Sequence, residues 1–299
     1  MSPAEVGAGG RVACIGGGHG LAATLRAVAP WADEVTAVVS VADDGGSSGR
    51  LRDDLGIVPP GDLRRCLSAL ADPTSVLGAA LEQRFDAGDL KEHALGNLLL
   101  AGLVEHGLSM VDALDEVGRL VGASGRVLPA ALVPVTLTGE RGDHDRVEGQ
   151  VQVQEAQGLR RIAVRPADPP SPQAVVDAIE AAHLVVMGPG SLFTSVLAAA
   201  VLPAVADALA ATAARRVLVL NLGPQRGETQ GLGPDDNVRA VTDHGVPFDA
   251  VLADPRFAPA EDHGVELLVR PVGADGRAVH DPALLGAALA RLVPSRGDR

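Results

Sequence analysis

Short apolar runs, each followed by a glycine-rich turn, recur along the chain. The runs at residues 11–15 (RVACI), 35–41 (VTAVVSV), 183–187 (HLVVM) and 216–222 (RVLVLNL) are continuous, without polar alternation. Continuous apolar runs of this length are typical of parallel strands buried on both faces. Helical patterns follow the first and third runs, at LAATLRAVA and VADALAATAA, which gives the strand–turn–helix order of an α/β fold. The pattern therefore predicts a mostly parallel sheet covered by helices.

The hydrophobic pattern changes between residues 127 and 165. VLPAALVPVTLTGE, VEGQVQVQEAQ and LRRIAVRP alternate with a period of two, most cleanly at VQVQ (151–154). Period-two alternation predicts half-exposed strands, so we expect a small antiparallel excursion or an extension of the sheet edge here, and not another βα unit. Two more apolar runs (248–254 and 266–272) and a closing helical pattern (282–293) follow. The expected fold is a Rossmann-like three-layer α/β/α domain with a mostly parallel sheet, spanning residues 1–299 as a single domain.

Composition removes several classes of partner. The net charge of −13 argues against nucleic acids and anionic membranes, and aromatic residues at 2% leave few platforms for stacking bases. No apolar run reaches the ~18 residues of a membrane span, and no signal peptide is evident, so we expect a cytoplasmic protein. The two cysteines, Cys14 and Cys66, have no nearby His or Cys in sequence and are interpreted as structural thiols.

The first glycine turn follows the run RVACI and consists of Gly16, Gly17, Gly18, His19 and Gly20. Gly18-x-Gly20-x-x-Ala23 fits the dinucleotide pattern G-x-G-x-x-G/A, and Asp43 lies about twenty residues on, at the end of the next predicted strand. Glycines let the backbone approach a phosphate, and a helix N-terminus offers free N–H groups. A tight turn without a ligand is the alternative. The pattern does not choose NAD over a nucleoside diphosphate.

Two adjacent acids, Asp43 and Asp44, end the second predicted strand. The following Gly45, Gly46, Ser47, Ser48, Gly49 and Arg50 provide small donors and one guanidinium group. Successive Gly and Ser amides can form an anion-binding nest, to which an arginine adds charge-assisted hydrogen bonds. Capping or simple solvation of the turn is the alternative for both acids. We expect this stretch to contribute to a nucleotide or sugar-phosphate site.

Two later motifs add candidates to the same site. Pro59-Pro60-Gly61-Asp62 predicts a turn and a helix start, where Asp62 either caps the helix or contacts the ligand, and Arg64 or Arg65 is available to an anion. Asn97, at a helix start after Gly96, either caps the helix or reads a base or sugar. His93 is interpreted as a surface histidine, and no metal site of the His/Cys type is expected.

The third and fourth turns repeat the pattern of the first. Gly188, Pro189, Gly190, Ser191 and Thr194 lead from a buried strand into a helix. The last candidates, Asn221, Glu228 and Thr229, follow the strand RVLVLNL, and Asp254 ends the next one as either a cap or a site residue. The carboxyl ends of parallel strands meet at one edge of a sheet, so we expect these groups to converge there.

With these motifs assembled, the chain resembles the YvcK family of gluconeogenesis factors and, more distantly, the CofD-type phospholactate transferases. The matching stretches follow the family's order from residue 16 to residue 232: GGGHGL, VADDGGSSGRLR, PPGDLRRCL, HALGNLLLAGL, GPGSLFTSVL and NLGPQRGETQGL. The chain departs from the family at His19 (often Thr), at Ala198-Ala199 (Pro-Asn) and at Arg226 (Pro), and the last change lies in a site loop.

The resemblance implies a Rossmann-like fold that binds UDP-sugars such as UDP-N-acetylglucosamine and links carbon metabolism to cell-wall synthesis and cell shape. It implies no required cofactor, with Mg²⁺ possible, and a homodimer with an unidentified regulatory protein partner. The first hypothesis is therefore a non-catalytic nucleotide-sugar-binding regulator. In it, residues 16–20 and 188–194 cradle the diphosphate, while Asp43, Asp44 and Asn97 read hydroxyl groups and Arg50 or Arg64 neutralises phosphate.

Two catalytic alternatives remain open. The second hypothesis is a CofD-like transferase in which Asp43 and Asp44 hold Mg²⁺ against a phosphate, although no general base with a supporting partner is evident. The third is an NAD-dependent oxidoreductase. It ranks lowest because the chain contains no tyrosine and shows no evident pair of a histidine with an acid.

Overall fold

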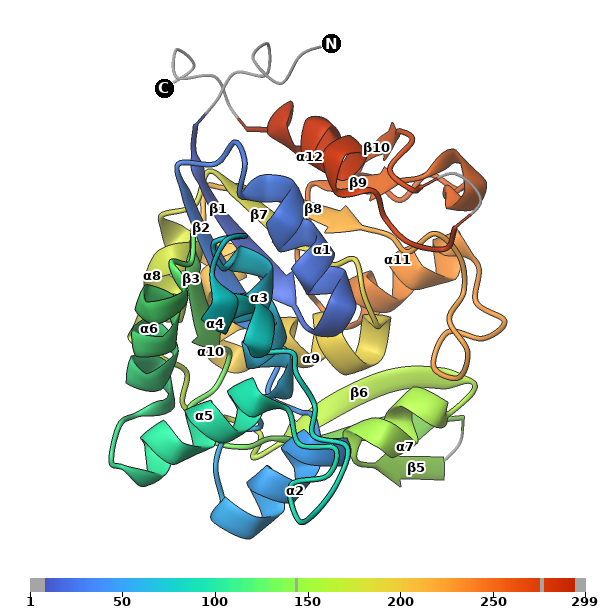
Figure 1. The fold of residues 1–299 in the computed structure, drawn as a ribbon. Helices are drawn as coiled ribbons and strands as arrows, with labels where there is room; N and C mark the ends of the chain where they lie inside the picture. The colour runs from blue at the N-terminus through green and yellow to red at the C-terminus, as the bar shows by residue number, and fades with distance from the viewer. Residues whose placement is uncertain (1–8, 143–144, 275–276, 294–299) are drawn as a thin grey trace.

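A seven-stranded parallel sheet forms the centre of the molecule (Figure 1). The computed structural model describes residues 9–142, 145–274 and 277–293. The strand order is β10-β9-β8-β7-β1-β2-β3, and every neighbouring pair is parallel. The bounds of the strands are Arg11–Gly16 (β1), Glu34–Val39 (β2), Arg126–Pro129 (β3), Leu184–Met187 (β7), Arg215–Val219 (β8), Ala250–Ala253 (β9) and Glu266–Val269 (β10). The predicted apolar runs contain strands of this sheet; β7 and β9 are fully buried, whereas β10, at the edge, is partly exposed.

The direction in which strands are added reverses between β1 and β7. The chain proceeds from β1 outward to β2 and β3, and then returns to β7, on the other side of β1, before continuing to β10. In an open α/β sheet, ligands bind at such a switch point, in the crevice outside the carboxyl ends of the strands. The first and third predicted glycine turns follow β1 and β7, so both lie at this point.

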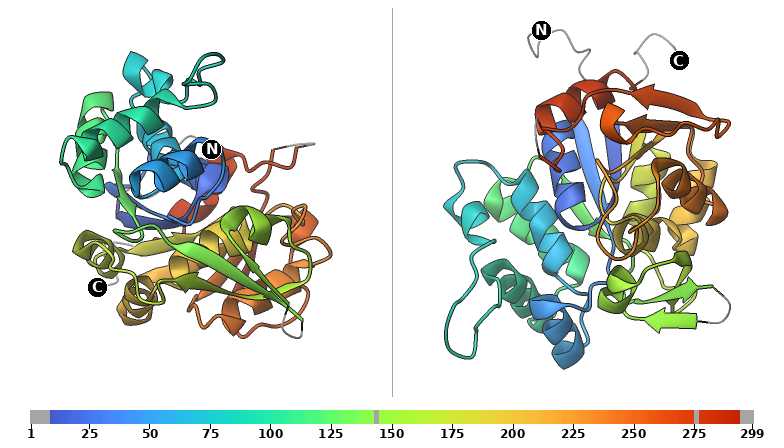
Figure 2. Two further views of the ribbon diagram at one scale, coloured as in Figure 1. Left: turned by 90° about the horizontal axis from the view of Figure 1, so that it is seen from below. Right: turned by 90° about the vertical axis from the view of Figure 1, so that its right-hand side faces the viewer.

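Helices cover both faces of the sheet, which confirms the three-layer α/β/α class (Figure 2). Helices α1, α3 and α12 pack together on one face, and α8 and α10 pack together on the other. The helix bounds are Gly18–Val28 (α1), Gly46–Leu55 (α2), Gly61–Leu70 (α3), Val76–Ala80 (α4), Leu95–Glu105 (α5), Met110–Val121 (α6), Gln150–Glu155 (α7), Gln173–Glu180 (α8), Ala198–Ala200 (α9), Pro203–Ala211 (α10), Pro234–Asp243 (α11) and Pro282–Ala290 (α12). A π-helical segment, η2 (Leu192–Leu197), precedes α9, and a short 3-10 helix, η3 (Pro255–Phe257), follows β9.

The excursion between residues 127 and 165 is partly as expected. Strands β4 (Thr136–Arg141), β5 (Asp145–Glu148) and β6 (Leu159–Arg165) form an antiparallel sheet in the order β5-β4-β6. Strand β3 pairs in parallel with β2 and forms one edge of the main sheet, which fits the alternative of an edge extension. One expectation is wrong: the VQVQ segment is helix α7. The helix forms because Asp44, more than a hundred residues earlier, accepts hydrogen bonds from its first amides. A local alternation could not reveal this distant cap.

The core is aliphatic, as the composition requires. Val, Leu, Ile and Ala from both helical layers bury the sheet, with Cys14 on β1 and Cys66 on α3 fully enclosed. Burial raises the pKa of both thiols, which is consistent with structural roles. Among the described residues no single helix has the length and apolar character needed to cross a membrane. Within the described ranges one pair of helices, Leu192–Ala200 and Pro203–Ala211, reaches that length and composition together, but the two are bent by 71° relative to each other.

Candidate functional site

The two glycine turns at the switch point touch each other. A Cβ on Gly20 would lie on the carbonyl oxygen of Pro189 and 2.6 Å from the Cα of Gly190. The Thr24 hydroxyl on α1 donates to the carbonyl oxygen of Gly188 at 2.8 Å. The first turn after β1 and the first turn of α1 therefore form one continuous wall with the β7 turn, as the convergence argument predicts.

The N-terminus of α1 is occupied by a carboxylate of the protein itself. The N–H of Gly18 donates to Asp62, and a Cβ on Gly17 would lie 2.6 Å from Asp62 Oδ2. Burial, followed by the charge of Asp43, raises the pKa of Asp62 to about 6, although Arg65 pairs with Asp62 at 2.6 Å. Asp62 lies in the first turn of α3 but accepts a hydrogen bond from the start of α1, so it links the two helices at the switch point.

Asp43 and Asp62, which are not adjacent in sequence, form the acidic pair of the site. Asp43 Oδ1 accepts from the N–H of Gly45 at 3.0 Å, while Oδ2 lies 3.0 Å from the position of a Cβ on Gly61. A Cβ on Gly61 would also meet the Ser48 hydroxyl, so Asp43 Oδ2 and this hydroxyl both lie against Gly61. Two carboxylates and a hydroxyl are oxygen donors of the kind that a divalent cation accepts, with water completing its shell.

Asp44 faces away from this pair. Its Oδ2 accepts from the N–H of Gln150 at 2.7 Å and its Oδ1 accepts from the N–H of Val151 at 3.0 Å. Both oxygens therefore cap α7, whereas Asp43 faces Asp62, so the two adjacent acids are used in different ways in this structure. The capping alternative for Asp44 fits the structure.

Replacing Asp44 with alanine is expected to lower the free energy of unfolding by about 1 kcal/mol, because it removes the cap of α7. Affinity for a nucleotide-sugar is expected to stay within about twofold of the parent. The matched control, Asp43→Ala, should show the opposite balance, with a small change in stability and a large loss of affinity. Urea denaturation and calorimetry on both variants measure the two quantities. An Asp44 variant with weakened binding and unchanged stability contradicts the assignment.

The predicted nest at residues 45–50 is the beginning of helix α2. Gly45 is its N-cap residue, and a Cβ on Gly49 would overlap the carbonyl oxygen of Asp44, so the tight approach requires glycine. Gly46, Ser47, Ser48 and Arg50 all lie within the helix. Arg50 donates to the carbonyl oxygen of Lys91 at 2.9 Å. It therefore holds the segment before α5 through one nitrogen of its guanidinium group, and its role toward a phosphate stays a prediction.

A buried polar chain connects α2 to α5. The Asn97 amide nitrogen donates to Ser47 Oγ at 3.0 Å, and Ser47 Oγ lies 3.0 Å from His93 Nδ1. His93 is only 9% exposed, so its assignment to the surface is wrong; α2, which the sequence did not predict, covers it. Burial lowers the pKa of His93. This pair of a serine with a histidine was not found from the sequence, where the two residues are 46 positions apart.

Basic residues lie beside the start of α1. Arg64 is 1% exposed and pairs with Glu82, and burial lowers its pKa. Its Nε, like that of Arg65, is buried and has no partner in the described part of the chain. Exposed His19 is close enough to these groups that its pKa is lowered, chiefly by burial and then by Arg65. Positive charge therefore accompanies the helix N-terminus.

The β7 turn carries a second internal carboxylate. Glu228 is buried, and its Oε2 accepts from the N–H of Thr194 at 3.1 Å and from the Thr194 hydroxyl at 2.8 Å. Burial raises the pKa of Glu228 despite these bonds. The amides that the sequence assigned to a phosphate are thus used by Glu228, so a diphosphate at Thr194 requires its displacement.

The remaining predicted residues of the third and fourth turns bind the protein's own backbone. Asn221 exchanges two hydrogen bonds with Gly190, at 3.1 Å and 2.7 Å, and the Thr229 hydroxyl accepts from the N–H of Gln225. Pro189 and Ser191 lie between β7 and η2. Asp254 is buried and accepts from Arg256 and from the N–H groups of Val272 and Gly273, so its capping alternative holds. These contacts shape the edge of the sheet.

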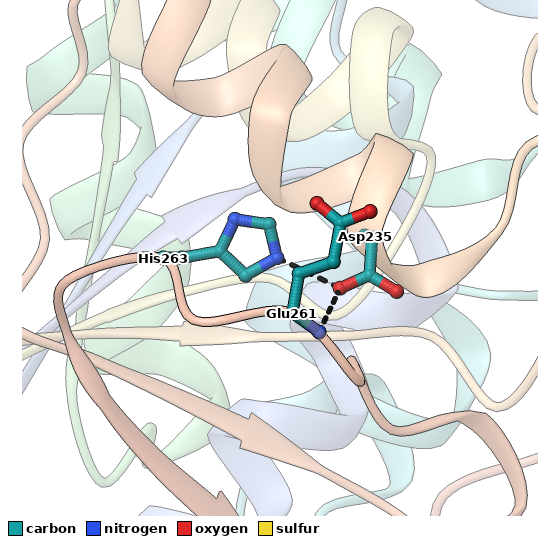
Figure 3. Close-up of side chains that lie close together, drawn as sticks. All are labelled: Asp235, Glu261 and His263. Atoms are coloured by element: carbon teal, nitrogen blue, oxygen red, sulfur yellow. Dashed lines mark hydrogen bonds and ion pairs between the residues drawn. The ribbon is translucent and has the colours of Figure 1, made fainter.

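A third cluster, away from the switch point, was not anticipated. Asp235, Glu261 and His263 bring ligand atoms within 4.8 Å of one another (Figure 3). Asp235 Oδ1 accepts from His263 Nε2 at 2.9 Å and from the N–H of Glu261 at 3.0 Å, bonds that lower the pKa of Asp235 to about 2. The expectation that no histidine pairs with an acid is therefore wrong. The bonds fasten residues 260–263 to the start of α11, and Glu261 itself pairs with Arg239.

The strand order and the glycine turns at the switch point define a doubly wound α/β protein. The chain belongs to the CofD family, since the family model described as 2-phospho-L-lactate transferase CofD matches residues 12–275. A gluconeogenesis-factor homologue of Mycobacterium tuberculosis (strain H37Rv) is 43% identical over 303 residues, covering 93% of this chain and 89% of its own. The protein named gluconeogenesis factor in Bacillus subtilis (strain 168) is 37% identical over 255 residues, covering 84% and 80%.

A solved structure supports the same placement. The crystal structure of a UPF0052 family member from Bacillus halodurans superposes with a TM-score of 0.89 at 32% sequence identity. The match covers 94% of this chain and 99% of the other. The resemblance stated from the motifs is thereby confirmed, both for the family and for the fold.

Proposed function

We propose that the protein is a UDP-sugar-binding regulator, with a UDP-N-acetylglucosamine-like ligand, that links gluconeogenic carbon metabolism to cell-wall synthesis and cell shape. The observation that carries the proposal is the α1 N-terminus at the switch point, where the glycine amides lie beside Arg64 and Arg65. One of these amides, that of Gly18, is bonded to Asp62, and each arginine is paired with a carboxylate. Such a helix start favours a phosphate through its amides and its dipole. The family's gluconeogenesis-factor name supports the metabolic part.

The residues around this helix start divide into two sets. Gly17, Gly18 and His19 provide the backbone amides for a diphosphate, which takes the place of Asp62 at the Gly18 N–H, with the guanidinium groups of Arg64 and Arg65 beside them. Asp43 and Asn97, from the neighbouring elements, are suited to hydroxyl or amide groups of the ribose or sugar. Glu228 accepts from the N–H of Thr194 in the β7 turn, so the diphosphate is proposed to bind at the β1 turn alone.

Calorimetric titration tests the proposal directly. UDP-N-acetylglucosamine and UDP-glucose are expected to bind. NAD is expected not to bind, because Glu228 occupies the amide of Thr194 in the β7 turn. GDP serves as the comparison for base preference. Absence of binding by both UDP-sugars removes the proposal, and NAD binding tighter than both would restore the dinucleotide alternative.

A second candidate is a CofD-like transferase that uses Mg²⁺. It is favoured by one observation, the approach of Asp43 and Asp62 with the Ser48 hydroxyl, and by the transferase name of the family model. In this version Asp62 replaces Asp44 as the second carboxylate. Incubation of UDP-sugar with the protein and Mg²⁺, followed by chromatography, should give no nucleotide product if the regulator is correct. Product release that Asp43→Asn abolishes would establish the enzyme.

A further inference from the structure

The chain from His93 through Ser47 to Asn97 ends in an unsatisfied acceptor. All three side chains are buried, and Asn97 is 1% exposed. The amide nitrogen of Asn97 is bonded to Ser47, but its Oδ1 is buried without a partner among the residues that the structure describes. A buried amide oxygen left unpaired costs about 1–3 kcal/mol, so a donor that reaches it, such as a hydroxyl or N–H group of a ligand, would be stabilised there.

The direction of each hydrogen bond in this chain follows from the chemistry of the groups. The Asn97 nitrogen can only donate, so Ser47 Oγ accepts from it. The hydroxyl hydrogen of Ser47 is then directed to His93 Nδ1, 3.0 Å away, which accepts when the ring is neutral and carries its hydrogen on Nε2. In this state Asn97 presents an acceptor, its Oδ1.

Protonation of His93 reverses the chain. Nδ1 then carries a hydrogen and donates to Ser47 Oγ, so the hydroxyl hydrogen of Ser47 must find another acceptor. The acceptor within reach is Asn97 Oδ1, after a half-turn of the amide about its last bond. That rotation places the NH₂ group where Oδ1 had been, and Asn97 presents a donor. The number of protons balances, since only the one bound by His93 is added.

We propose that Asn97 is a ligand-contacting residue whose hydrogen-bonding character is set by His93 through Ser47. In the neutral state Asn97 accepts a hydrogen bond from a hydroxyl or amide N–H group of the ligand; after protonation of His93 it presents a donor and no longer matches that group. His93 is thus a positioning residue that makes recognition sensitive to pH. The proposal deepens the nucleotide-sugar function and rests on it for the identity of the ligand.

The charges around His93 determine the pH at which the hydrogen bonds of the chain reverse. Arg50 and Asp54 face it from α2, and Arg84 faces it from the segment before α5. Burial and then Arg50 favour the neutral ring, Asp54 opposes them, and Arg84 adds to the lowering of the pKa. Asn97 therefore presents its acceptor at neutral pH, and the reversal belongs to acidic conditions below the ordinary histidine pKa of about 6.5.

The hydrogen-bond chain can be tested without any ligand. Nitrogen-15 spectra of the protein labelled at histidine should show His93 near pH 7.5 with its hydrogen on Nε2 and a bare Nδ1. The side-chain amide signals of Asn97 should shift in the same pH step as the His93 ring, and Ser47→Ala should remove that coupling. A neutral His93 with its hydrogen on Nδ1, or an Asn97 amide that ignores the His93 titration, overturns the proposal whatever the ligand is.

Calorimetry with UDP-N-acetylglucosamine tests the consequence for binding. Asn97→Leu is expected to weaken affinity about tenfold at pH 7.5. On acidification from pH 7.5 to about 5.5, the affinity of the parent should fall relative to that of Ser47→Ala. The ratio of the two dissociation constants should therefore approach one. The control His106→Gln removes an exposed histidine at the end of the same helix and should follow the parent. Parallel pH profiles of the parent and Ser47→Ala overturn the proposal, whereas absence of binding in every variant removes the proposed function and leaves the spectroscopic test to decide.

Discussion

Replacing Gly20 with alanine is expected to lower the free energy of unfolding by about 3 kcal/mol. The added Cβ would meet the carbonyl oxygen of Pro189 and the Cα of Gly190, which are both backbone atoms. Neither can rotate away as a side chain could, so the turns after β1 and β7 must separate. That separation also stretches the bond from the Thr24 hydroxyl to Gly188. Urea denaturation gives the difference in stability.

A matched glycine provides the control for this prediction. Gly102 also lies inside a helix, α5, but it is exposed and nothing lies within 4 Å of a Cβ added there. Gly102→Ala is expected to stabilise the protein by up to about 1 kcal/mol, because alanine has the higher helix propensity. The two alanine substitutions should therefore change stability in opposite directions. Equal effects at both positions would show that the turns at the switch point tolerate separation.

Asparagine in place of Asp62 is expected to raise the affinity for UDP-N-acetylglucosamine about tenfold at pH 7.5, measured by calorimetry in EDTA. The carboxylate lies at the α1 N-terminus, where the diphosphate is proposed to bind, and two anions there repel each other. The pKa of Asp62 is raised to about 6. In the protein without ligand the side chain is therefore charged at pH 7.5 and becomes neutral as the pH falls through about 6. Binding through this group should therefore tighten on acidification.

The sign of this effect separates it from that of His93, which weakens binding on acidification. The Asp62 contribution disappears in Asp62→Asn, while the difference between the parent and Ser47→Ala persists in that background. Asp53→Asn, an exposed acid on α2, removes the same charge and should leave affinity nearly unchanged. Weaker binding by Asp62→Asn in EDTA would contradict placement of the diphosphate at α1. Weaker binding only when Mg²⁺ is present would instead indicate that Asp62 holds the ion.

The sheet and the location of the site could be predicted because they depend on local signals. Buried parallel strands must be apolar on both faces, and glycine turns at their carboxyl ends meet wherever the strands are neighbours. The pairing of polar groups could not be predicted in this way. Asp44 caps a helix 106 residues later, Glu228 occupies amides 34 residues earlier, and His93 is covered by α2. Each is a contact between segments whose patterns carry no sign of the other.

Glu228 gives the two halves of this fold unequal roles. A doubly wound sheet is built from two mononucleotide-binding halves, and a dinucleotide extends across both. In the half that begins with β7, the N–H and hydroxyl groups of Thr194 at the helix start already donate to the buried carboxylate of Glu228. The phosphate of a second nucleotide would have to displace Glu228 from the N–H and hydroxyl groups of Thr194. The architecture is shared with dinucleotide-binding enzymes, but under the proposed function this side chain favours a ligand with one nucleotide end.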